Sequence, residues 1–264
     1  MTEPTVMRGF SALGYSEVRV TGVAECRVQS SCDDLHQARE RELEWASTTS
    51  SVQGWGPPVE ARLAPGGLFA QWLPCYQMSE EEVLGVARTF AEVFGTVHVW
   101  RGDFFADRPL LALVGGASDG PLDTDGLVAR ARSLAGGSGD DLACGAEAIP
   151  LHLYAGTLGR RSEVLANARI LEADLPWLAW SAPRSERAHQ GADRSELMVG
   201  ERLLAFETRI LPADANRLVR AGLVMRRMGL ALHVLDRRAH ARALLDYVRL
   251  VPADLRPDLE RWIE

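Results

Sequence analysis

The stretch that decides the fold begins at Leu68 and reads LFAQWLP, CYQM and SEEEVLGVARTFAEVFG. Leu68–Leu73 is a short apolar run that ends at Pro74, which predicts a buried strand. Ser79 and Glu82 have the spacing of a capping box, in which each side chain accepts from the other residue's free backbone N–H. The sequence here therefore predicts a strand followed directly by a helix.

The predicted helix has one continuous apolar face, and Gly95 is suited to end it. Its face repeats at 3.6-residue spacing and consists of Val83, Val86, Ala87, Phe90, Val93 and Phe94. Two further apolar runs, Val97–Trp100 and Leu110–Val114, predict strands joined by a broad hairpin. We expect all three strands to lie in one sheet, with the helix packed on it.

The rest of the chain divides by composition around this α/β region, which we assign to residues 61–190. Residues 1–60 are rich in turn formers and weakly periodic, so we expect a divergent or poorly specified N-terminal segment. Asp123–Leu134 has a helical pattern. Residues 191–264 have one too, interrupted by Pro212 and Pro252, and predict a helical C-terminal appendage.

Composition excludes several classes of protein. A formal charge of −7 argues against a nucleic-acid-binding platform, and no apolar run approaches the length of a membrane span. All 29 basic residues are arginine, which excludes Schiff-base lysines and Walker-type phosphate loops. The four cysteines form no CxxC pair and the six histidines no HExxH motif. We therefore expect no metal site, no secretory signal and a reduced, cytoplasmic protein.

Several collinear motifs resemble those of spermidine synthase-like proteins, the polyamine aminopropyltransferase family. The string RLAPGGLFAQWLP, at 62–74, is similar to the final parallel strand of that family's Rossmann-like, methyltransferase-type domain. The resemblance continues through YQMS at 76–79, RTF at 88–90, WRGDF at 100–104, DRPLLALVG at 107–115 and LPWLAWSAPR at 175–184. It covers roughly the C-terminal half of the domain.

The resemblance implies a partial Rossmann-like sheet and a transferase of polyamine biosynthesis. Such an enzyme passes a propylamine group from decarboxylated S-adenosylmethionine, as cosubstrate, to a polyamine, without a metal. A homodimer is an option within this family. The implied domain holds S-adenosyl ligands on a glycine-rich loop after its first strand, and no such loop is visible before residue 60. We therefore expect a family member that has lost the transfer activity.

Four residues are candidates for the site that the resemblance implies. Gln71, Tyr76 and Gln77 flank the carboxyl end of the first predicted strand, where open α/β sheets place ligands. Gln71 equally well hydrogen-bonds neighbouring backbone, and Tyr76 equally well covers the strand end. Asp34 either echoes the acidic residue that binds the cosubstrate near its adenine or caps a helix.

Three functions remain open from the sequence. The first is aminopropyl transfer, and the second is a non-catalytic scaffold or interaction module that retains the second half of the fold. The third is a methyltransferase-like enzyme, because fold alone does not decide which group is transferred.

The loop between the second and third predicted strands contains Asp103 and Asp107, which we expect to be solvated turn residues.

Overall fold

The computed structural model describes residues 67–116, 123–135, 148–171, 177–178, 181, 184–185, 187 and 196–256. The N-terminal segment 1–60, with its candidate residue Asp34, lies outside the described residues. So does most of the stretch at 175–184 that carries the last part of the resemblance.

The described elements include both strands and helices up to Gly159 and helices alone after it. In chain order they are β1 Leu68–Pro74, η1 Cys75–Gln77, α4 Glu80–Phe94, β2 Thr96–Arg101, β3 Leu110–Gly116, α5 Thr124–Ala135, α6 Ile149–Leu153, β4 Tyr154–Gly159, η3 Glu163–Leu165, α8 Gly200–Ile210, α9 Arg217–His233, α10 Arg237–Leu250 and η4 Ala253–Leu255. The protein therefore belongs to the α/β class.

The four strands form one sheet in the order β1-β3-β2-β4, and every adjacent pair is antiparallel. The prediction that the three apolar runs share a sheet is confirmed, and β4 is an addition that the sequence pattern did not predict. Because β3 runs opposite to both of its neighbours, β1 and β2 run in the same direction. The expectation of a parallel pairing for β1 is not met within the described part, where β3 is its antiparallel partner.

Helix α4 forms as its sequence predicts. Ser79 Oγ accepts from the Glu82 N–H at 3.2 Å, and Glu82 Oε2 accepts from the Ser79 N–H at 2.7 Å. Gly95 ends the helix with a φ of 75°, a conformation that glycine adopts without strain. The predicted apolar face is buried against β2 and β3, with Val83, Val86 and Phe90 fully inaccessible to solvent.

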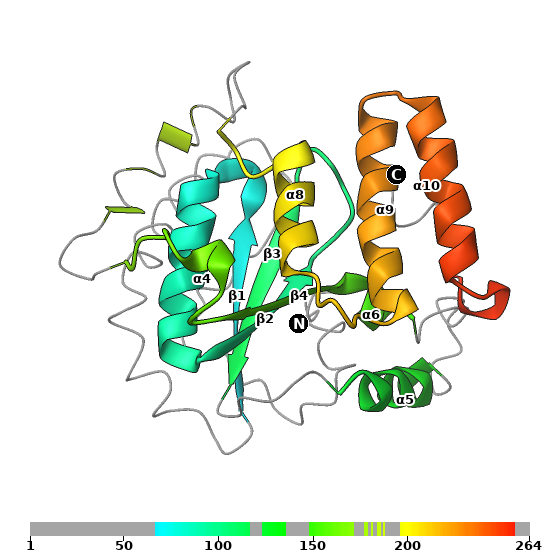
Figure 1. The fold of residues 1–264 in the computed structure, drawn as a ribbon, viewed down its shortest axis with the longest axis horizontal. Coiled ribbons are helices and arrows are strands. Elements are labelled where there is room, and N and C mark those ends of the chain that lie inside the picture. Colours follow the sequence, from blue (N-terminus) through cyan, green and yellow to red (C-terminus); the bar gives the residue numbers. More distant parts are fainter. Residues whose placement is uncertain are drawn as a thin grey trace, which may run out of the picture.

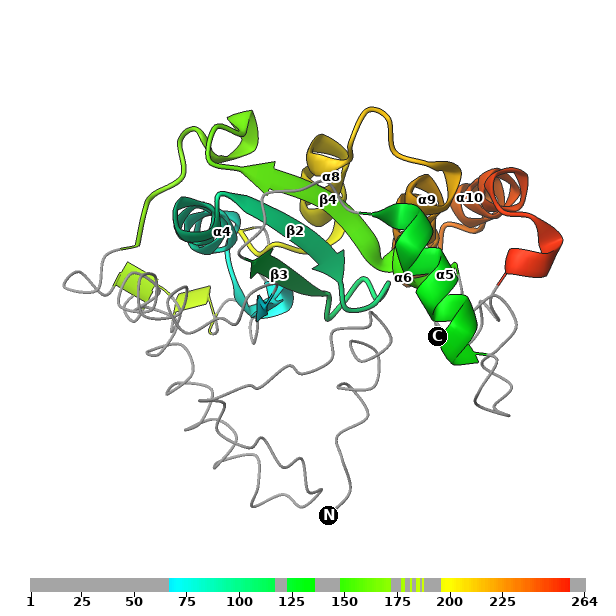
Figure 2. The same cartoon turned by 90° about the horizontal axis from the view of Figure 1, so that it is seen from below.

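Two apolar layers cover the sheet, one on each face. Helix α4 packs on one face, and α8 contributes Leu203, Phe206 and Ile210 to the same cluster. Helices α5, α6 and α9 lie on the opposite side (Figures 1 and 2), where Trp100 and Tyr154 belong to the second cluster. The sheet is thus buried between two helical layers, and both layers include helices from the C-terminal third of the chain.

The long helical pattern at the C-terminus is two helices rather than one. Helices α9 and α10 lie side by side (Figure 1), joined by the turn at Val234, Leu235 and Asp236. Asp236 caps α10 by accepting from the backbone N–H groups of Arg238 and Ala239, which fixes where the second helix begins. No helix in the described ranges has the length and apolar character that crossing a membrane requires.

Candidate functional site

Of the candidates named from the sequence, Tyr76 and Gln77 lie at the carboxyl end of β1. Tyr76 and Gln77 are consecutive residues of η1, directly after the strand, and both are partly buried. Gln71 lies within the strand, roughly 10 Å before Pro74 at about 3.3 Å per residue. The structure therefore places Tyr76 and Gln77 together and Gln71 apart from them.

The Gln71 side chain takes part in the fold rather than facing a cavity. It is 7% exposed, and its Nε2 donates to the Trp72 carbonyl at 3.0 Å. Gln71 pairs with Leu113 in the register. It lies on the same face of the strand as Phe69 and Leu73, which pack on the α4 side. Of the two interpretations left open by the sequence, the structure shows hydrogen bonding to neighbouring backbone.

The most concentrated charge in the described part is a buried network of Arg101, Glu207, Arg226 and Asp103. Glu207 Oε2 accepts from Arg101 Nε at 2.9 Å, and Glu207 Oε1 accepts from Arg226 Nε at 3.2 Å. Neither Arg101 nor Glu207 has any side-chain exposure. Burial lowers the pKa of Arg101, and the adjacent Glu207 carboxylate opposes that change. The network ties the end of β2 to helices α8 and α9.

The expectation that Asp103 is a solvated turn residue is wrong. Its side chain is only 13% exposed and lies 3.4 Å from Arg226 Nη1. It also accepts from the backbone N–H groups of Phe105 and Leu110, at 3.0 and 3.2 Å, and so shapes the loop between β2 and β3. Burial raises its pKa, against the opposing effect of the Arg226 charge. Asp107, in contrast, is exposed as expected.

Arg101 also holds the start of β4 through two backbone carbonyls. Its Nη1 donates to the His152 and Tyr154 carbonyls at 2.9 and 2.7 Å. Helix α9 approaches this point at Gly222, where an added Cβ would lie 1.9 Å from the His152 carbonyl oxygen. A side chain larger than hydrogen is therefore excluded where α9 crosses α6.

Behind this network lies a buried pair, His152 of α6 and Tyr247 of α10. The imidazole Nε2 and the Tyr247 hydroxyl are hydrogen-bonded at 3.0 Å. Burial lowers the pKa of His152 to about 4, and the Arg101 charge acts in the same direction. Burial likewise raises the pKa of the Tyr247 hydroxyl. Both groups are therefore neutral near pH 7.

Cys75 follows β1 directly and is fully buried. Burial raises the pKa of its thiol, while the Arg226 charge opposes the rise and the Glu207 and Asp103 charges add to it. Because the thiolate is the reactive form of cysteine, this environment makes Cys75 a packing residue and not a nucleophile.

A second buried carboxylate, that of Glu82, stands at the start of α4. In addition to its role in the capping box, its Oε2 accepts from Ser185 Oγ at 2.7 Å. Its other oxygen, Oε1, has no hydrogen-bond partner among the described residues. Glu82 thus combines a capping role at the start of α4 with a hydrogen bond to a segment more than 100 residues later in the chain.

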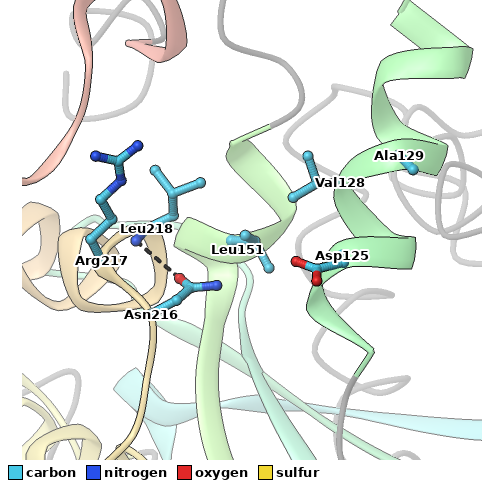
Figure 3. A pocket seen from close by; sticks show the side chains of 7 residues that line it. All are labelled: Asp125, Val128, Ala129, Leu151, Asn216, Arg217 and Leu218. Atoms are coloured by element: carbon cyan, nitrogen blue, oxygen red, sulfur yellow. Dashed lines mark hydrogen bonds between the residues drawn. The ribbon is translucent and has the colours of Figure 1, made fainter.

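A hollow of about 310 Å³ lies elsewhere, between α5, α6 and the start of α9. Figure 3 shows the labelled side chains around it, with Leu151 between Asp125 on one side and Asn216 on the other. The Asn216 side-chain oxygen accepts from Leu218 N–H at 3.0 Å and caps α9. The hollow is also lined by Val128, Ala129, Arg217 and Leu218. None of the residues named from the sequence as ligand-binding candidates lines it.

The buried network was not predicted from the sequence, although each of its core residues occupies an apolar position of its element. Glu207 falls on the apolar stripe of α8, three residues before Ile210 and four after Leu203. Arg226 likewise falls on the buried face of α9. In β2, Arg101 continues the two-residue spacing of the buried Val97 and Val99. A charged residue at a core position of an amphipathic element needs a partner of opposite charge, because burying an unpaired charge costs free energy.

The described part contains no cluster of three or more histidine, cysteine or acidic side chains placed to hold a metal ion. Comparisons with protein-family models, with curated protein sequences and with solved structures produce no match to this chain.

Proposed function

We propose that this chain is a spermidine synthase-like protein whose sheet is the closing edge of a Rossmann-like, methyltransferase-type domain. The observation that carries the proposal is the order β1-β3-β2. Strands β1 and β2 run in the same direction and are linked through α4, and the later strand β3 enters between them antiparallel to both. A reversed strand inserted between two strands of the same direction is the arrangement that the resemblance implies, and β4 extends the sheet beyond it on the other side of β2.

The chemistry of the family is a direct displacement at carbon. The amine nitrogen of a polyamine forms a bond to the propyl carbon of decarboxylated S-adenosylmethionine, the carbon–sulfur bond breaks, and methylthioadenosine leaves. The proton of the attacking amine passes to a base. In this chain the residues at the corresponding edge are Tyr76 and Gln77, with the buried carboxylate of Glu82 at the start of the next helix.

We further propose that the 264-residue chain by itself does not carry out this transfer. Gln71, the candidate within the strand, is buried and engaged with backbone. The sequence before residue 60 shows no glycine-rich turn to contact the cosubstrate closely and no assigned acid on its ribose. Each lost contact of this kind weakens binding by about 1–3 kcal/mol, so two or three lower affinity roughly a hundredfold or more.

Isothermal titration calorimetry with decarboxylated S-adenosylmethionine and with methylthioadenosine tests this proposal. We expect weak or undetectable heats and no conversion of putrescine. Micromolar affinity, with putrescine turnover that disappears in Gln71→Ala, would show a working transferase. A crystal structure tests the fold separately, because the proposal requires a parallel strand against the second edge of β1.

The second candidate function is an interaction module without catalysis, favoured by the surface of the C-terminal hairpin. Six of the eight exposed large hydrophobic side chains in the described part lie between Leu232 and Val248. Clustered exposed apolar side chains mark sites of association. A cytoplasmic location is part of this proposal, supported by the free, buried thiol of Cys75.

A further inference from the structure

The apolar side chains of the hairpin form an ordered stripe on α10. Leu244, Leu245 and Val248 are exposed, and at 100° per residue they fall within about 100° of the helix circumference. Ala241 lies within the same arc and is also exposed. We call these four residues the α10 stripe.

The stripe faces away from the fold. Helix α10 buries Ala243 and Tyr247, on a different side of the helix, against α9. Figure 1 shows α10 on the outer side of α9, away from the sheet. An amphipathic helix ordinarily exposes charged and polar residues on its outer side, so a second apolar face needs its own explanation.

The turn before α10 adds to the apolar surface. Val234 is 61% exposed and Leu235 is 85% exposed. Leu235 has a φ of 57°, and it is the only non-glycine residue with positive φ in the described part. Glycine or asparagine is the usual residue in this conformation, so a solvent-facing leucine here is doubly unfavourable in the isolated chain.

Arginines border the stripe on one side. Arg238, Arg242 and Arg249 are exposed and fall within about 40° of one another, next to Leu245 around the helix. With Arg237 and a single acid, Asp246, the helix has a formal charge of +3 in a chain whose net charge is −7. Asp246 lies 3.2 Å from Arg249, which leaves the other arginines of the row to face solvent.

We propose that the α10 stripe is a docking surface for an amphipathic helix of a partner protein that carries Asp or Glu beside its own apolar face. A stripe about 100° wide with a spacing of three and four residues matches the seam between two packed helices. The arginine row selects the acidic flank and fixes the orientation of the partner. This inference develops the interaction-module function and does not depend on whether the chain transfers propylamine groups.

Two other occupants fit the same surface less well. A second copy of the chain would bring two arginine rows of the same charge together across the interface. An anionic membrane would attract α10 but repel a chain of net charge −7, and the stripe lacks the Trp and Phe side chains typical of interfacial helices.

The test uses the full chain and two synthetic helical peptides, measured by fluorescence anisotropy. Both peptides present leucines at every third or fourth position; one is flanked by glutamates, the other by lysines. We expect saturable binding of the glutamate peptide only. Leu245→Ser with Val248→Ser should weaken binding by at least about tenfold, and Arg238→Gln with Arg242→Gln by about threefold to fivefold. Ile170→Ser, an equally exposed apolar position on the connection after β4, should leave it unchanged.

Three outcomes would overturn the proposal: failure to bind the glutamate peptide, equal binding of the lysine peptide, or binding that survives the double serine change. Sedimentation of the chain with phosphatidylserine vesicles, or self-association lost in Leu245→Ser, would reassign the surface to lipid or to a second copy. Failure here leaves the calorimetry with S-adenosyl ligands unaffected, so the two proposals fail separately.

Discussion

At the scale of single residues, the buried charges set the geometry around the end of β2. Arg101, Glu207 and Arg226 come from three elements and converge in an environment with almost no exposure. Glu207 is the shared partner, because each of its oxygens faces a different guanidinium. Its removal therefore affects two buried positive charges at once.

We expect Glu207→Gln to lower the free energy of unfolding by about 3–5 kcal/mol, since it leaves Arg101 buried without a counter-charge and Arg226 with Asp103 alone. Urea denaturation measures this. The matched control is Glu80→Gln, which removes an acid that pairs with Arg202 and Arg209 at 2.9 Å on the surface. That change should cost less than about 1 kcal/mol. Similar losses in the two variants would contradict the role given to burial.

His152 makes stability depend on pH. Its pKa is about 4 in the folded protein and 6.5 ordinarily, so between these values the unfolded chain binds a proton that the folded chain does not. Stability due to this group is complete above pH 6.5 and is lost as the pH falls toward 4, by on the order of 3 kcal/mol. Urea unfolding across this range should show a shallower dependence in His152→Gln than in the parent chain. A pH dependence in His152→Gln as steep as in the parent chain would refute the assignment.

At the scale of elements, α4 is the helix whose ends are specified most completely by its own residues. The capping box at Ser79 and the positive φ of Gly95 fix its length, and the apolar face fixes its orientation on β2 and β3. This is why the sequence alone located it correctly, together with the strands before and after it.

Ser79→Ala should destabilise the protein by about 1 kcal/mol, because the Glu82 backbone N–H loses its partner. Thermal denaturation followed by circular dichroism measures the loss. Ser162 provides the control, since it precedes η3 without a side-chain cap bond. An effect of Ser162→Ala as large as that of Ser79→Ala would show that the cap is not the cause.

Other elements had no local signal that could predict them. Strand β4 has the sequence YAGTLG, whose two glycines disfavour a strand, and it forms because β2 and the Arg101 side chain hold it. The break between α9 and α10 occurs without glycine or proline, at a leucine in a left-handed conformation. For the buried network the sequence indicates that Arg101 and Glu207, at core positions, each need a partner, but they are 106 residues apart and nothing near either residue identifies the other.

At the scale of the whole molecule, the fold is a sheet between two helical layers with α10 outside them (Figure 2). Strands β2 and β3 each have a hydrogen-bonded neighbour on both sides. Helix α10 packs chiefly on α9 and has an exposed outer side. The protection of the backbone should therefore differ sharply between these regions.

In native-state hydrogen exchange we expect the amides of β2 and β3 to exchange only through global unfolding. Those of α10 should exchange through local opening, at a lower free energy, since this outer helix packs chiefly on α9 and leaves its other side exposed. Uniform protection of α10 and the central strands, measured on the same sample without a partner, would contradict this ranking. Binding of a glutamate-flanked peptide should raise the protection of α10 alone.

The separation between Arg101 and Glu207 also has a consequence during synthesis. A ribosome adding about 5–20 residues per second makes Glu207 roughly 5–20 seconds after Arg101. During that interval the nascent chain holds a guanidinium that cannot yet be buried, so the end of β2 and the start of β4 must stay hydrated. The packing of α4 on β2 and β3 can form early, whereas both helical layers are completed only when α8 and α9 are made in the last third of the message. A nascent chain stalled before residue 207 should therefore be recognised by chaperones as incomplete, even though all four strands of the sheet have been synthesised.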